Sequence, residues 1–175
     1  MNTKERRELI ASKLDGIYDV IGPGHEDQWM IGNFPEPSVT HDRSHRYLPP
    51  VKGEYIHAVD ANGNSVVPWY PSAVKWNLTG AIMMAADKYK DDRGDRFPNA
   101  WQTTVMSYYI SRVIKNKYYD RLHAEVKPLG ISKPAASTII TWFGSLSDIY
   151  YYEHLSVIAS AIKLARDDER EEIRW

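Results

Sequence analysis

The stretch that decides the fold is "PSAVKWNLTGAIMMAADKY", residues 71–89. Apolar side chains recur in it every three or four positions, which is the spacing of one face of an α-helix. The face is broad, so we expect this helix to be central and largely buried. Gly80 lies inside it and lowers its stability relative to alanine, which close approach by a neighbouring segment would explain. The face consists of Val74, Leu78, Ala81, Ile82 and Ala85, widened by Trp76, Met83 and Ala86.

Three further segments show the same helical spacing of apolar residues. Asn99 and Ser147 precede two of them and are candidate N-caps, because their side chains can accept a hydrogen bond from the first turn. Residues 135–143 are rich in β-branched side chains and fit either a short helix or a strand. The three segments are residues 3–21, 100–119 and 148–172.

Two non-helical segments separate the first two helices. Residues 22–53 contain five prolines and keep no apolar period, so they predict a long irregular loop that aromatic side chains pin to the body. Residues 54–68 alternate between apolar and polar and contain the turn pair Asn62-Gly63, so they predict a β-hairpin. Residues 90–99, "KDDRGDRFPN", predict a charged loop with a turn at Arg93-Gly94-Asp95.

The predicted fold is therefore mainly α (α+β). It is a helical bundle of about four main helices, with one β-hairpin and a long irregular N-terminal loop. The chain length fits a single globular domain over residues 1–175, whose helical core spans residues 69–175.

Charge and composition narrow the classes of function. The formal net charge is −1 and there are no cysteines, so no global field attracts nucleic acid, and disulfides and thiolate sites are excluded. The first residues lack the apolar run of a secretory signal, and no window approaches the ~20 apolar residues that cross a bilayer. We expect a cytoplasmic protein without a membrane partner, in the host cytoplasm if the chain is viral.

Residues 58–166 carry a loose pattern made of a short hairpin, a helix with Ala-x-x-Trp and a Gly-Ala pair, and a closing helix. The residues of this pattern are Ala73, Trp76, Gly80, Ala81, Trp142 and "SAIKLA" at 160–165. The pattern resembles an uncharacterised family of small proteins from bacteriophages and actinobacteria. The resemblance implies the helical fold and a phage context, and no activity. The chain departs from the family at Phe143-Gly144, where an Asn-Asp pair is expected, so no role of that pair carries over.

The proline-rich loop contains "HDRSHR" at residues 41–46. On a helix, His41 and His45 would share one face at i and i+4 and could bind one metal ion, with Asp42 as a further ligand or as an orienting neighbour. Zinc or manganese suits such ligands. Prolines on both sides disfavour a helix there, and a third ligand with a recognised spacing is missing. A solvated loop without a cofactor is therefore the first expectation.

The same loop also permits a phosphate-binding interpretation. Arg43 and Arg46 can each make two hydrogen bonds to a phosphate, and Trp29 could stack on a base. A nucleic-acid-binding protein is therefore an alternative, although the chain as a whole is not basic.

Adjacent aromatic residues give a third candidate surface. Neighbours on a helix point about 100° apart, so one ring can enter the core while the other faces outward. Exposed aromatic side chains anchor protein partners. Tyr108, Tyr118 and Tyr150, together with Trp29, are thus candidate contacts for a protein partner or for a second copy of the chain.

The sequence lacks a Gly-x-Ser-x-Gly elbow, a Walker loop, a GxGxxG motif and an HExxH motif. His57, His123 and His154 are isolated and favour a structural role over that of a catalytic base. The sequence favours a non-catalytic accessory protein of phage type, which binds a host factor, inhibits a defence system or assembles with itself. The alternatives are a small metal-dependent enzyme built on "HDRSHR" and a nucleic-acid-binding protein.

Overall fold

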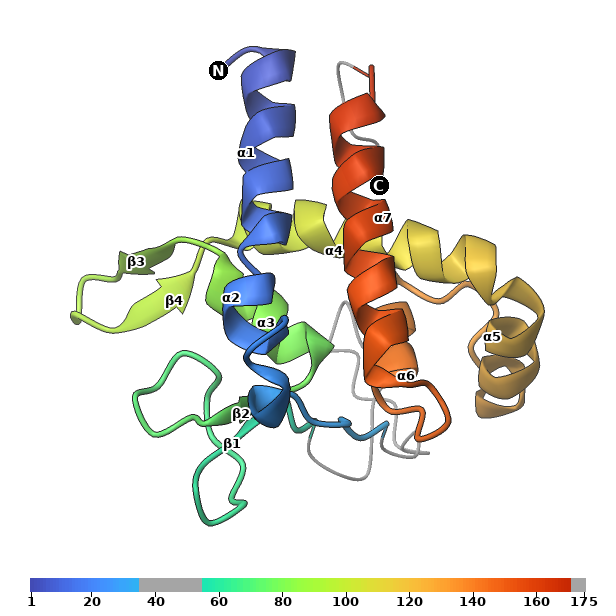
Figure 1. Ribbon diagram of the computed structural model, residues 1–175, viewed down its shortest axis with the longest axis horizontal. Helices are drawn as coiled ribbons and strands as arrows, with labels where there is room; N and C mark the ends of the chain where they lie inside the picture. The colour runs from blue at the N-terminus through green and yellow to red at the C-terminus, as the bar shows by residue number, and fades with distance from the viewer. Residues whose placement is uncertain (35–54, 171–175) are drawn as a thin grey trace.

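The structure is a computed structural model that describes residues 1–34 and 55–170. Helices dominate it, so the mainly α (α+β) class is confirmed, and strands occur in the described part only as two short antiparallel pairs (Figure 1). The helices are α1 (Thr3–Asp15), α2 (Tyr18–Ile21), α3 (Leu78–Ala85), α4 (Ala100–Lys117), α5 (Tyr119–Val126), α6 (Ala136–Gly144) and α7 (Tyr151–Asp167). The strands are β1 (Ala58–Val59), β2 (Lys75–Trp76), β3 (Lys88–Lys90) and β4 (Arg96–Pro98).

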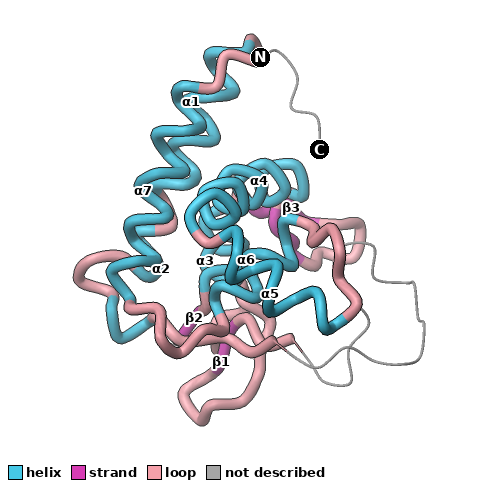
Figure 2. Tube along the Cα trace, turned by 90° about the vertical axis from the view of Figure 1, so that its right-hand side faces the viewer, coloured by secondary structure: helices cyan, strands magenta, loops and turns pink. Residues whose placement is uncertain are grey.

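Helices α1 and α7 lie side by side in opposite directions and cross α4 (Figure 1, Figure 2). Helix α4 contacts both of them and α6, so it is the centre of the bundle. Each of these helices contributes fully buried side chains to the core, among them Leu14 of α1, Ile110 of α4 and Ile158 of α7. Each such burial contributes about 1.5–3 kcal/mol relative to exposure, so apolar packing holds the bundle together. None of the described helices combines the length and apolarity needed to span a bilayer.

The predicted helix over residues 3–21 is divided in the structure. Helix α1 begins at a capping box, in which the side chains of Asn2 and Glu5 each accept a hydrogen bond from the backbone N–H of the other. Gly16, a poor helix former, separates α1 from α2. The apolar period continues across the break, because α2 still buries Ile21 in the core.

The predicted helix over residues 71–89 is shorter at both ends, because the residues before Asn77 pair with β1 and those after α3 form β3. Asn77 is the N-cap of α3, and its buried side chain accepts a hydrogen bond from the Gly80 N–H at 2.8 Å. The close approach predicted at Gly80 is confirmed. A Cβ added there would lie 2.1 Å from the carbonyl oxygen of His57.

The predicted hairpin over residues 54–68 is present mainly as a turn. Asp60 Oδ1 accepts hydrogen bonds from the N–H groups of Asn62 and Asn64, both at 2.9 Å. The return segment adds a single bridge to β1, whose ladder partner is β2 instead. Trp76 of β2 is buried, so apolar packing favours β2 as the partner of β1.

Strands β3 and β4 form a second hairpin, where the prediction of a charged loop is wrong. Its turn repeats the first one in a D-x-x-G-x sequence at residues 91–95. Asp91 Oδ1 accepts hydrogen bonds from the N–H groups of Arg93 and Asp95 at 2.9 and 2.8 Å. Gly94 has a φ of 81°, which glycine adopts without strain. The turn predicted at Arg93-Gly94-Asp95 is therefore confirmed, and the strands around it are additional.

Two predictions for the C-terminal half concern residues 135–143 and the N-cap of the last helix. Residues 136–144 form helix α6, because burial of most of its side chains outweighs the low helix propensity of β-branched residues. Ser147 is not the N-cap of α7. The cap position is held by Tyr150, whose side chain makes no capping hydrogen bond.

We expect Gly80→Ala to lower the free energy of unfolding by about 1–3 kcal/mol, because the added methyl group meets backbone that cannot move aside. The matched control is Gly144→Ala, where the added Cβ would lie 3.9 Å from the Leu78 Cβ, an ordinary contact. That control should change the free energy by less than about 1 kcal/mol. Urea denaturation followed by circular dichroism measures both, and equal effects would contradict the close approach.

Candidate functional site

Strands β3 and β4 stand out from the helical body as a two-stranded ribbon (Figure 1). Tyr89 and Phe97 are cross-strand partners, so their side chains leave the ribbon on the same face, with ring centroids 6.0 Å apart. Trp69, in the segment before β2, places its ring 6.2 Å from that of Phe97. We name Trp69, Tyr89 and Phe97 the aromatic surface, in which Tyr89 is 52% exposed and Phe97 is 37% exposed.

The other face of the ribbon is basic. Lys88, Lys90 and Arg96 alternate with the aromatic pair and therefore leave the ribbon on the opposite side. Lys88 Nζ turns back to α3 and donates hydrogen bonds to the carbonyls of Met84 at 2.9 Å and Ala86 at 2.5 Å. Partial burial holds the pKa of Lys88 below its ordinary value. These bonds satisfy carbonyl groups at the end of α3 and attach the ribbon to that helix.

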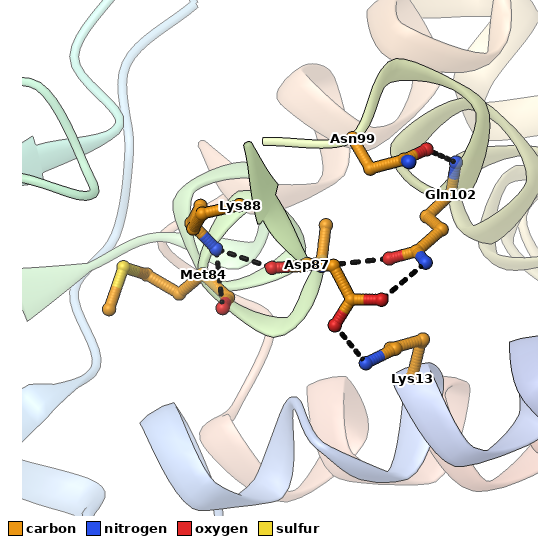
Figure 3. A network of polar contacts seen from close by, with 7 residues as sticks. Lys13, Met84, Asp87, Lys88, Asn99 and Gln102 are labelled. Atoms are coloured by element: carbon orange, nitrogen blue, oxygen red, sulfur yellow. Dashed lines mark hydrogen bonds and ion pairs between the residues drawn. The ribbon is translucent and has the colours of Figure 1, made fainter. Parts of the chain in front are cut away.

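A polar network fixes the base of the ribbon, as Figure 3 shows. Lys13 Nζ of α1 donates to Asp87 Oδ1 at 2.5 Å, and Gln102 Nε2 of α4 donates to Asp87 Oδ2 at 2.7 Å. The Asp87 N–H in turn donates to Gln102 Oε1 at 2.8 Å. The Asp87 carbonyl accepts a hydrogen bond from the Asn99 N–H at 2.7 Å. The hydrogen bond from Gln102, followed by that from Lys13, holds the pKa of Asp87 below its usual range.

A second group with unusual chemistry is the imidazole of His154 on α7. It is fully buried between the rings of Trp29 and Phe143, whose centroids lie 5.1 and 4.6 Å away. Neither of its ring nitrogens has a hydrogen-bond partner in the described part of the chain. Burial lowers the pKa of His154 to about 4, and the charge of Glu153 offsets only part of that shift. The imidazole is therefore neutral at neutral pH and enclosed by rings, which does not suit proton transfer to a substrate.

Two of the aromatic residues predicted to bind a partner belong to this buried cluster. Trp29 packs on His154, and Tyr118 places its ring 5.3 Å from that of Phe143. The Tyr118 hydroxyl donates a hydrogen bond to Glu153. Burial, followed by that hydrogen bond, raises the pKa of Tyr118 to about 12. Both predicted residues are half-buried and are used inside the molecule.

The other two predicted aromatic contacts lie apart from this cluster. The hydroxyl of Tyr108, which is half-buried, accepts hydrogen bonds from Arg112 at 3.1 Å and from Arg170 at 2.9 Å. Tyr150, before the first turn of α7, is 76% exposed. Of the four, Tyr150 keeps the exposure that its predicted role requires.

The remaining predicted site residues lie outside the described residues. These are Arg43 and Arg46 of the phosphate interpretation, and His41, Asp42 and His45 of the zinc or manganese interpretation. Within residues 1–34 and 55–170, no group of three or more His, Cys, Asp or Glu side chains is arranged to hold a metal ion. Both interpretations of the "HDRSHR" segment stay predictions.

The aromatic surface is missing from the sequence-based predictions, although a signal for it exists. The D-x-x-G-x turn at residues 91–95 repeats the one at residues 60–64. Tyr89 stands two residues before this turn and Phe97 two residues after it, which is the spacing of a cross-strand pair. The charged residues of the turn obscure this pattern.

We expect Gln102→Ala to lower the free energy of unfolding by about 1–3 kcal/mol, because it truncates a buried side chain and removes the acceptor of the half-buried Asp87 N–H. Lys13→Met removes only an exposed ion pair and should cost less than about 1 kcal/mol. Urea titrations followed by circular dichroism compare the two variants. A larger loss for Lys13→Met would show that the ion pair, rather than the amide, secures the base of the ribbon.

We expect the protein to lose stability between pH 6.5 and pH 4. The imidazole of His154 takes up a proton near pH 6.5 in the unfolded chain, but only near pH 4 in the folded one. The unfolded state binds more protons across this window, so His154 alone lowers the free energy of unfolding by about 3 kcal/mol as the pH falls.

The matched variant is His154→Phe, which fills the site with an apolar ring. It should lose this share of the pH dependence and retain the share of His57, whose pKa burial also lowers to about 4. Urea titrations at pH 7 and pH 4 measure both proteins. If the two stabilities decline in parallel, His154 is not the titrating group.

Comparison with known proteins gives no relative: no family model, curated protein or solved structure matches the chain. The resemblance of residues 58–166 to the uncharacterised phage and actinobacterial family therefore stays a prediction. The candidate site rests on its own geometry.

Proposed function

We propose that this chain is a non-catalytic accessory protein that acts by binding another protein through the aromatic surface. The observation that carries the proposal is the partial exposure of Tyr89 and Phe97 on a ribbon that is anchored at its base. Tyrosine and tryptophan dominate the binding energy of protein interfaces because they bury large areas at a low cost in conformational entropy.

Anchoring supports this proposal, because a surface held in its bound conformation loses less entropy on association. Two further apolar side chains that follow Trp69 in the sequence are exposed, Tyr70 at 55% and Val74 at 40%.

The partner class follows from the expected setting of the protein. In a phage context the partner is a host factor, a component of a defence system or a second copy of the chain, and the interaction takes place in the cytoplasm. The proposal requires no cofactor. A zinc- or manganese-dependent enzyme would instead depend on His41, Asp42 and His45, and nucleic-acid binding on Arg43 and Arg46.

The test compares two double variants that each remove two exposed aromatic rings. Tyr89→Ala with Phe97→Ala alters the aromatic surface, and Tyr150→Ala with Tyr152→Ala alters the start of α7, where both rings are exposed. Partners are captured from lysate of the producing cells, purified, and titrated against each protein. We expect the first pair to weaken binding by about 30-fold or more, which corresponds to the loss of a binding hot spot of at least 2 kcal/mol.

Sedimentation velocity examines self-association with the same variants, and circular dichroism verifies that each one folds. A wild-type protein that stays monomeric and captures no protein would contradict the proposal. The proposal would also be contradicted if the Tyr150 and Tyr152 substitutions weakened binding of the partner and the Tyr89 and Phe97 substitutions did not. Binding would then use the surface around Tyr150 that the sequence predicts.

A further inference from the structure

The ribbon has backbone groups available to a further strand. Strands β3 and β4 pair with each other and with no other strand of the described chain, so each keeps one edge outside the ladder. An edge of this kind is a template on which an extended peptide can add as another strand.

The register indicates which edge is the better template. Hydrogen bonds join Asp87 to Asn99 and Asp91 to Asp95. Because hydrogen-bonded pairs alternate in an antiparallel ladder, Tyr89 bonds to its partner while Lys88 and Lys90 turn their backbone N–H and C=O groups outward. On β4 the corresponding position opposite Lys88 is a proline, which has no N–H to donate. Strand β3 therefore offers the more complete edge.

Charge indicates the chemistry of the segment that fits this edge. Lys90 and Arg96 are direct cross-strand neighbours, and two like charges in that position repel each other. Neither of them has an ion-pair partner among the described residues. Lys88 lies on the same face, but its Nζ donates to the carbonyls of Met84 and Ala86, so the charge available to a ligand comes from Lys90 and Arg96. The face is therefore complementary to carboxylates.

The opposite face of the ribbon carries Tyr89 and Phe97, so it suits apolar side chains. Successive side chains of an added strand point alternately to the two faces. We infer that the partner presents an extended segment of alternating acidic and apolar residues, which adds to the edge of β3 with its carboxylates on the basic face. This inference rests on the proposed function and names the partner segment.

A competing explanation exists for basic residues at this place, because charged side chains on edge strands prevent aggregation. The two explanations differ in their consequences. A protective role requires no particular ligand and no use of the backbone, whereas strand addition requires both the charges and the outward N–H groups of β3.

The experiment titrates the full chain, at low ionic strength, against the fluorescein-labelled peptide GEVEVEVG and its rearrangement GEEEVVVG, and follows fluorescence anisotropy. We expect the alternating peptide to bind at least tenfold more tightly than the rearranged one. Lys90→Glu with Arg96→Glu should weaken its binding at least tenfold. Lys115→Glu with Lys163→Glu, an equal charge change on exposed helix positions, should have less than a twofold effect.

A second pair of variants tests the use of the backbone. Lys90→Pro removes the charge and the outward N–H, whereas Lys90→Gln removes the charge alone. The ladder of the ribbon should survive both, because the Lys90 N–H is not part of it. We expect Lys90→Pro to bind the alternating peptide at least fivefold more weakly than Lys90→Gln, with unchanged circular dichroism.

Several results would overturn the inference. These are absence of peptide binding, equal binding of the two peptides, equal affinities of the Pro and Gln variants, and tighter binding of a labelled single-stranded oligonucleotide through Lys90 and Arg96. In any of these cases, the proposed function still stands if Tyr89→Ala with Phe97→Ala weakens binding of the captured partner. Only the inferred chemistry of the partner segment is then rejected.

Discussion

The direction of the ribbon depends on the pair formed by Gln102 and Asp87. The amide of Gln102 bonds both the backbone N–H and the carboxylate of Asp87, the residue that links α3 to β3. Asn99 is the N-cap of α4, the helix that carries Gln102, and it donates its N–H to the Asp87 carbonyl. Both strands of the ribbon are therefore held where they leave the helical body. A two-stranded ribbon is only marginally stable alone in water. Its attachment to α1, α3 and α4 supplies the order that a binding surface needs.

Availability of a tyrosine to a partner is decided by residues that are distant in the sequence. Tyr118 donates its hydroxyl to Glu153, and Tyr108 accepts a hydrogen bond from Arg170. Local sequence patterns around Tyr108 and Tyr118 contain no information about these partners. Exposure of Tyr89, by contrast, follows from the local register that the turn at residues 91–95 imposes.

The helices could be predicted from the sequence because burial requires an apolar period, and that period is visible in one segment at a time. The helix boundaries could not, since they depend on partners elsewhere. Helix α3 starts at Leu78 because β1 pairs with the residues before Asn77. The only sign of this pairing in the sequence is Gly80, whose lack of a side chain permits the close approach of His57. The hairpin at β3 and β4 could not be predicted, because the four charged residues in its turn at 91–95 resemble a solvated loop.

The pairing of α1 with α7 determines when the protein can acquire its core during synthesis. Of these elements the ribosome releases α1 first and α7 last, so the buried residues of α1, such as Leu14, lack the packing of α7 until almost the whole described chain has emerged. Contacts between such distant parts of a chain form slowly, because closing the long intervening loop costs entropy before any contact offsets it. Until α7 emerges, the apolar face of α1 that packs on it stays uncovered, and chaperones engage such surfaces on nascent chains.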